Sequence, residues 1–221
     1  IQPPDYSSGI SWRYLPGARI SAFMPEKPAS KKVLTEDFYS ACFPEISYDG
    51  RFMLFTAQQN EGDPWQIWEM ELGNLESRKI TSLAENCTDP VYLPGGRMAF
   101  SRLTINDTVK SAHCLYTCNL DGSGLRQISF SPGANFATTV LKDGRLLTIS
   151  RQLDPGRGNP MFMVLRPDGT KADMFYMGEA GTAIAVNACE TSDGKIVFIE
   201  SDKENLSKKN IISIKYNHPL H

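Results

Sequence analysis

The sequence predicts an all-β chain built from four repeats of a four-stranded unit, arranged as blades of a β-propeller. Three observations carry this prediction: a hairpin turn recurs four times at a nearly constant spacing, a second turn recurs at the same period, and helical patterns are nearly absent. A period of about 40 to 50 residues is typical of propeller blades. We expect these four blades to be part of a larger propeller.

The first turn is expected to join the first two strands of each blade. Its glycines are Gly50, Gly96, Gly144 and Gly194, spaced by 46, 48 and 50 residues, and each is followed by a basic residue and an apolar run. Glycine adopts the positive φ that a primed hairpin turn requires. Four such turns in register therefore predict four equivalent hairpins.

The second half of the unit repeats as well. A third strand is expected at residues 66–72, 114–120 and 161–165, and a short final strand at residues 78–81, 126–129 and 172–176. The turns Asp121-Gly122 and Asp168-Gly169 lie 47 residues apart, so a second landmark keeps the period. Residues 52–55 and 196–199 are apolar at successive positions, which is typical of a sheet buried on both faces. The repeats are placed at about residues 43–81, 88–129, 136–176 and 184–216.

The flanking segments leave two alternatives open. Residues 32–35 resemble residues 78–81, the last strand of a blade, while no fourth strand follows residues 211–216. Residues 32–35 either close a four-bladed ring or belong to an adjoining blade of a six- to eight-bladed propeller, with the remainder missing or in another polypeptide. We favour the larger propeller, because residues 19–23 resemble a third strand that a closed ring would leave surplus. Residues 1–18 are expected to form an irregular arm, and the start at Ile1 indicates a processed form or a piece of a longer protein.

One motif resembles a known family. The pattern Pro44-x-x-Ser47-x-Asp49-Gly50-x-x-x-x-Phe55 is similar to the TolB-like, WD-type propeller repeat, in which Pro and then Ser-Pro-Asp-Gly precede an apolar strand ending in Phe. The resemblance covers residues 43–216, with Tyr48 at a position where the family has Pro. It implies a propeller and a periplasmic, secreted or envelope-associated protein. The family includes binding proteins and the propeller halves of prolyl oligopeptidase-like enzymes, so the resemblance does not fix one function.

Composition and motifs exclude several classes of function. Lys and Arg number 23 against 25 Asp and Glu, so no overall positive charge favours nucleic acid. No apolar run approaches the ~20 residues of a membrane-spanning helix. Nucleophile-elbow, zinc-protease and nucleotide-binding motifs are absent from the sequence, and we predict no catalytic residue, metal or cofactor. The five cysteines are interpreted mostly as buried apolar residues, and His113 is assigned no role.

We therefore expect a non-catalytic binding or scaffold protein that presents a loop face to a protein, peptide or glycan partner. The alternative is the propeller portion of a larger enzyme, a prolyl oligopeptidase-like hydrolase or another, whose active centre lies outside this chain. The loops at residues 58–65, 103–111, 152–160 and 202–209 are expected on the face opposite the glycine turns, and they are long and variable, as functional loops are.

The candidate binding residues in these loops are Asn60, Asp63, Trp65, Asn106, Asp107, Asp154, Arg157 and Asn159. Trp65 is favoured because an indole beside polar donors suits sugars and protein partners. The competing interpretation is that the loops are tolerated surface insertions, with Trp65 packed under its own loop.

Overall fold

The computed structural model describes residues 13–105, 112–131, 133–153, 158–178, 182–184, 186–202, 205 and 208–216. Its regular structure is β-strand, and no α-helix occurs in these ranges, which confirms the all-β prediction. Within the same ranges, no helix is long and apolar enough to cross a membrane.

The strands group into four blades and one separate hairpin. The hairpin comprises β1 (Ser21–Met24) and β2 (Lys27–Val33). Blade 1 comprises β3 (Ser40–Ile46), β4 (Phe52–Gln58), β5 (Gln66–Glu71) and β6 (Ser77–Lys79), and blade 2 comprises β7 (Cys87–Leu93), β8 (Arg97–Thr104), β9 (Ala112–Asn119) and β10 (Arg126–Gln127). Blade 3 comprises β11 (Gly133–Val140), β12 (Leu146–Gln152), β13 (Met161–Leu165) and β14 (Asp173–Tyr176). Blade 4 comprises β15 (Thr182–Ile184), β16 (Cys189–Glu190), β17 (Lys195–Asp202) and β18 (Lys209–Lys215).

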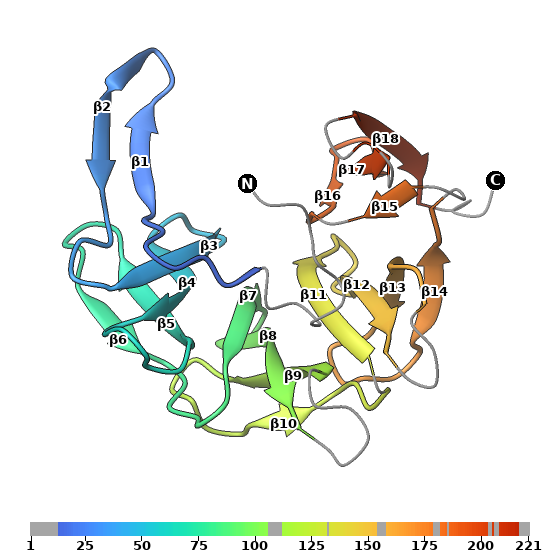
Figure 1. Cartoon of the computed structure of the whole chain (residues 1–221), viewed down its shortest axis with the longest axis horizontal. Helices are drawn as coiled ribbons and strands as arrows, with labels where there is room; N and C mark the ends of the chain where they lie inside the picture. The colour runs from blue at the N-terminus through green and yellow to red at the C-terminus, as the bar shows by residue number, and fades with distance from the viewer. Residues whose placement is uncertain are drawn as a thin grey trace.

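The blades follow one another in chain order around a common axis, and the arc is open between blade 1 and blade 4 (Figure 1). Strands within each blade pair antiparallel, and in blade 4 both β15 and β16 pair with β17 as one interrupted inner strand. A single parallel bridge, between Ala134 and His113, joins blades 2 and 3 into one sheet. This arrangement confirms a β-propeller architecture and shows no ring closure among the described residues.

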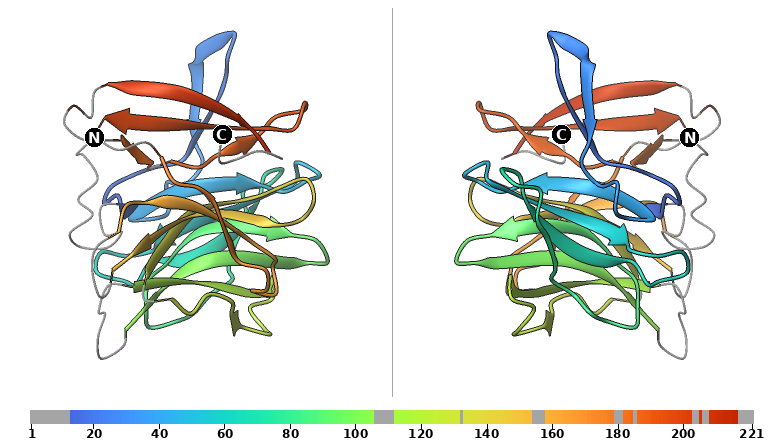
Figure 2. Two further views of the ribbon diagram at one scale, coloured as in Figure 1. Left: turned by 90° about the vertical axis from the view of Figure 1, so that its right-hand side faces the viewer. Right: turned by 90° about the vertical axis from the view of Figure 1, so that its left-hand side faces the viewer.

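The glycine turns are formed as predicted. Gly50, Gly96, Gly144 and Gly194 have φ of 71°, 70°, 83° and 77°. These turns line one side of the molecule, which we call the turn face, and the β4–β5 loop lies on the opposite side, which we call the loop face (Figure 2). The Asp before the glycine also stabilises the turn, because Asp143 Oδ1 accepts a hydrogen bond of 3.0 Å from Arg145 N.

The inner strand of each of the first three blades carries a β-bulge. The pairing register shifts within β3, β7 and β11, and at each shift one non-glycine residue is left-handed: Phe43 (φ 53°), Asp89 (φ 53°) and Ala137 (φ 52°). Such a backbone costs about 1–2 kcal/mol for an L-residue, so packing at the axis must hold it. The sequence analysis did not predict these bulges.

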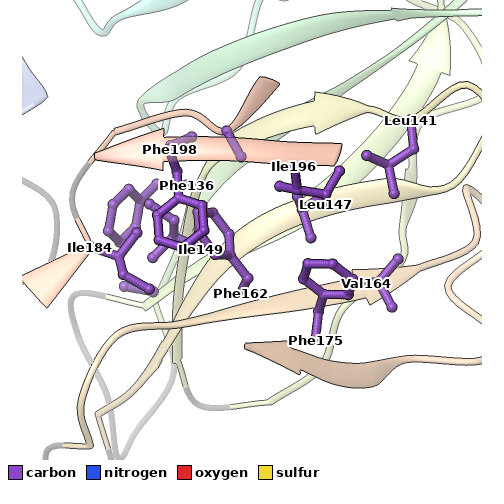
Figure 3. Packing of buried hydrophobic residues seen from close by; sticks show 13 residues of the cluster. Phe136, Leu141, Leu147, Ile149, Phe162, Val164, Phe175, Ile184, Ile196 and Phe198 are labelled. Atoms are coloured by element: carbon purple, nitrogen blue, oxygen red, sulfur yellow. The ribbon is translucent and has the colours of Figure 1, made fainter. Parts of the chain in front are cut away.

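Apolar clusters fill the seams between blades. Between blades 3 and 4, Phe136, Ile149 and Phe162 pack against Ile184 and Phe198 (Figure 3), and the Phe162 and Phe198 rings lie 4.9 Å apart. Both faces of β4 are likewise buried, since Leu54 belongs to the blade 1–blade 2 cluster and Met53 to a cluster on the opposite face. The consecutive apolar residues of the second strands are explained by this two-sided burial.

The β1–β2 hairpin has the contacts of a third and fourth strand. Ile20 N donates to Thr35 Oγ1 (3.0 Å), as Ile67 N donates to Thr81 Oγ1 (2.8 Å) in blade 1. Ser21 pairs with Val33, and the hairpin projects from the arc (Figure 1). In this structure residues 32 and 33 therefore pair with β1, and β18 pairs with β17.

Candidate binding face and axial cluster

The β4–β5 loop is held by its own polar residues. Asn60 donates from N and Nδ2 to Asp63 Oδ2 at 2.9 and 3.0 Å, and Gln58 Nε2 donates to the carbonyl oxygen of Asp63 at 2.6 Å. The candidate residues Asn60 and Asp63 thus fix a turn on the loop face, with Asn60 exposed. Asn159 is exposed beside β13. The remaining candidates, which lie outside the described residues, are Asn106, Asp107, Asp154 and Arg157.

Trp65 lies beneath this face and is only 4% exposed. Its backbone is fixed on both sides, because Trp65 N donates to Asn86 Oδ1 (3.0 Å) and Cys87 N donates to Trp65 O (2.8 Å). The indole packs beside the ring of Tyr14, with centroids 5.4 Å apart. Trp65 is therefore a buried platform that contacts the N-terminal arm.

Tyr14 also contacts His113, to which the sequence assigned no role. The Tyr14 hydroxyl lies 3.0 Å from His113 Nε2, and His113 is 3% exposed. Burial raises the pKa of Tyr14 well above its usual value, so the hydroxyl keeps its proton at neutral pH. His113 and Trp65 occupy equivalent positions in blades 2 and 1. Each lies two residues before a third-strand residue, Leu115 or Ile67, whose N–H donates to the hydroxyl of Ser129 or Thr81. The sequence shows that His113 and Trp65 occupy equivalent positions in their blades. It does not show that both contact Tyr14.

Arg13 of the arm occupies the propeller axis. Its Nε donates to Asp89 Oδ2 at 3.0 Å, and its Nη2 contacts Asp89 Oδ1, with side-chain exposures of 4% and 2%. Ala137 N donates to the same Asp89 Oδ2 at 3.1 Å. The guanidinium also lies over the rings of Phe43 (4.3 Å) and Phe136 (5.3 Å). One arginine thus contacts the inner strands of three blades at their bulges.

We call these residues together the axial cluster, and its members are Arg13, Tyr14, Phe43, Trp65, Asp89, His113 and Phe136. The neighbouring thiol of Cys42 is unsuited to nucleophilic chemistry, since burial and the charge of Asp89 raise its pKa to about 12. The described residues contain no group of His, Cys, Asp and Glu arranged to hold a metal ion. The cluster has the chemistry of recognition, with a carboxylate, aromatic faces and a tyrosine–histidine contact.

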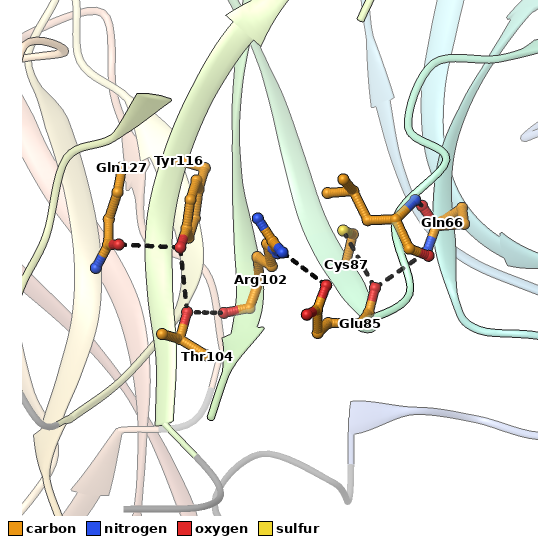
Figure 4. Close-up of polar contacts among 8 residues, drawn as sticks. Gln66, Glu85, Cys87, Arg102, Thr104, Tyr116 and Gln127 are labelled. Atoms are coloured by element: carbon orange, nitrogen blue, oxygen red, sulfur yellow. Dashed lines mark hydrogen bonds and ion pairs between the residues drawn. The ribbon is translucent and has the colours of Figure 1, made fainter. Parts of the chain in front are cut away.

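A polar seam connects blades 1 and 2 (Figure 4). Gln66 Nε2 donates to the carbonyl oxygens of Leu83 (3.0 Å) and Glu85 (3.1 Å), and Arg102 Nη2 donates to Glu85 Oε2 at 2.6 Å. The hydrogen bond from Arg102 lowers the pKa of Glu85. These bonds fix the strands that carry the loops, so the loop face rests on a rigid base.

The turn face holds a groove that the sequence analysis missed. It has a volume of about 580 Å³ and lies between the turns of blades 1 and 2, beside Tyr48, Tyr92 and Pro94. At its base Glu69 Oε2 accepts from Arg78 Nε at 2.9 Å, and Glu69 Oε1 accepts from the Tyr92 hydroxyl at 3.0 Å. The groove combines residues of two blades, so no local pattern could have indicated it.

Comparison with known proteins identifies the fold. No protein-family model matches the chain. A curated relative, hydrazine synthase subunit alpha of Kuenenia stuttgartiensis, is 36% identical over 84 residues, which is 38% of this chain and 10% of that protein.

Solved structures match nearly the whole chain. The Kuenenia stuttgartiensis hydrazine synthase structure has a TM-score of 0.81 at 22% identity and covers 98% of this chain and 37% of its own. TolB from Acinetobacter baumannii has a TM-score of 0.54 at 15% identity, covering 84% and 46%, and a Mycobacterium tuberculosis puromycin-hydrolyzing peptidase has 0.63 at 12% identity, covering 86% and 30%. This chain therefore spans less than half the length of each of these proteins, and its fold is that of the TolB-like β-propeller.

Proposed function

We propose that this chain is a binding scaffold whose loop face receives a protein, peptide or glycan partner in the periplasm, in the cell envelope or outside the cell. One observation carries the proposal: the arm and three blades meet beneath this face in the axial cluster, which holds Trp65 and His113 in fixed positions. Variable loops above a rigid base are a usual place for recognition. The likeness to TolB supports the proposed location.

The test compares the two faces of the propeller. A photo-crosslinking amino acid is placed at Glu61, an exposed residue of the β4–β5 loop, or at Pro94, an exposed residue of the β7–β8 turn. Each variant is irradiated with an extract of envelope proteins and glycans, after circular dichroism has confirmed its fold. We expect a defined adduct from position 61 and none from position 94. An adduct from position 94 alone, or from neither position, contradicts binding at the loop face.

A second candidate is the propeller portion of a larger enzyme. It is favoured by the lengths of the matches, since the chain corresponds to 30% of the puromycin-hydrolyzing peptidase and 37% of the hydrazine synthase chain. The active centre would then lie in another part of the polypeptide. A fluorophosphonate probe, which labels serine hydrolases, would label the intact protein if that part is a hydrolase. An intact polypeptide that carries no further domain on either side of residues 1–221 contradicts this candidate.

A further inference from the structure

The axial cluster has the chemistry that recognises a guanidinium group. Asp89 offers both carboxylate oxygens to the fork of Arg13, and the Phe43 and Phe136 rings lie within cation–π distance of the same group. A planar fork suits this combination of a bidentate carboxylate and aromatic faces better than a lysine ammonium does. The geometry of the site therefore suits arginine.

The blades form this site, and the arm fills it. The bulges at Phe43, Asp89 and Ala137 arise from the pairing of each inner strand with the next strand of its own blade. Ala137 N holds the Asp89 carboxylate from a neighbouring blade. Residues 13–20 belong to no strand. The arm thus contacts the blades as a ligand contacts a surface, without adding a strand to them.

The contacts of the arm with the blades continue past Arg13 through a turn, which Ala18 N closes by donating to Leu15 O at 3.1 Å. The Tyr14 side chain contacts both Trp65 and His113, while Leu15 O accepts from Ser40 Oγ at 2.5 Å. Farther on, Ala18 O accepts from Ala41 N at 2.9 Å. Two side-chain subsites are followed by backbone hydrogen bonds, which are independent of sequence.

We propose that the propeller axis is a binding site for an arginine followed by an aromatic residue in a peptide segment, and that Arg13 and Tyr14 are an intramolecular ligand of this site. The proposal rests on the loop-face function above and names its ligand class. A tethered ligand acts at an effective concentration of about millimolar order. A partner peptide must therefore displace the arm, and the arm sets the threshold for binding.

The test supplies the arm as a separate peptide. A peptide with the sequence of residues 11–18 is titrated by calorimetry into the wild-type chain and into the Arg13→Ala, Tyr14→Ala variant, whose two subsites are vacated. A matched peptide carries Lys in place of Arg. We expect the variant to bind the Arg peptide at least 10-fold more tightly than wild type does, and at least 10-fold more tightly than it binds the Lys peptide. Adding Asp89→Asn should abolish this binding.

A folded variant that binds neither peptide, or binds both equally, overturns the proposal. If the double variant does not fold, Arg13→Lys replaces it, because this change keeps the positive charge and removes the fork. The Arg peptide should then raise the melting temperature of Arg13→Lys more than that of wild type, and equal shifts overturn the proposal. The crosslinking result is independent of the peptide titration. Adducts from position 61 without peptide binding support the loop-face function and refute the arginine site. Peptide binding without adducts supports the arginine site and refutes the loop-face function.

Discussion

The propeller axis and the rim of the turn face both pair a carboxylate with a cation, in opposite surroundings. At the axis the side chains of Arg13 and Asp89 are 4% and 2% exposed, whereas at the rim Lys195 and Asp193 are 46% and 56% exposed with 2.6 Å between Nζ and Oδ2. Exposed ion pairs contribute about 0–1 kcal/mol. Breaking a buried pair costs about 3–5 kcal/mol, because one charge remains buried without its partner. Of these two pairs, we therefore expect the axial one to contribute more to the stability of the fold.

The axial pair offers the largest expected effect. Asp89→Asn should lower the free energy of unfolding by about 3–5 kcal/mol, since it leaves the buried Arg13 facing a neutral group. Asparagine tolerates the left-handed φ of residue 89, so backbone strain is not added. Adding Arg13→Met removes the unpaired charge and should recover much of the loss. Urea denaturation of the single and double variants measures both effects, and a loss below about 1 kcal/mol for Asp89→Asn would place this pair in the exposed class.

The second-largest effect is expected at a turn that contacts the neighbouring blade. An added Cβ at Gly169 would lie 2.5 Å from Ile128 O of the preceding blade, at a φ of 85°. Gly169→Ala combines this clash with left-handed strain and should destabilise by about 3 kcal/mol. The denaturant midpoint reports the change, and a midpoint equal to wild type would show that the blades do not pack at this turn.

Gly144 is the matched control for Gly169. Its φ is 83°, but nothing lies within 4 Å of an added Cβ. Gly144→Ala should therefore cost only the strain of about 1 kcal/mol, with a larger cost, up to about 2 kcal/mol, for the β-branched Gly144→Val. If Gly144→Ala destabilises as much as Gly169→Ala, contact with the neighbouring blade is not the source of the difference.

The rim carboxylate should give the smallest effect, and only in acid. Hydrogen bonds from Lys195 and Thr191 lower the pKa of Asp193 from 3.8 to about 2. Because the folded pKa lies below the unfolded one, the stability from this group is present above about pH 4 and lost as the pH falls towards 2. Asp193→Asn should flatten this part of the pH profile and change little at pH 7. Thermal unfolding between pH 2 and 7 measures the profile, and an unchanged slope in acid contradicts the assignment.

The sequence by itself determined the blade pattern, because the signals for it are local. Gly50 and its equivalents favour a hairpin without any distant partner. The apolar runs of the second strands indicate burial on both faces, whichever blades lie on either side. The sequence also indicates that β2 resembles the last strand of a blade, because residues 32–35 are similar to residues 78–81.

Only the tertiary structure decided what lies at the axis. Arg13 and Asp89 are 76 residues apart, so no spacing rule relates them, and the left-handed Phe43 and Ala137 are not residues that favour such a backbone. The sequence makes Trp65 a candidate binding residue, with packing under its own loop as the alternative, but it does not show that the indole packs against Tyr14, which lies far from it in the chain. These contacts form because several blades converge on one line, and each residue's environment there is set by neighbours from other blades.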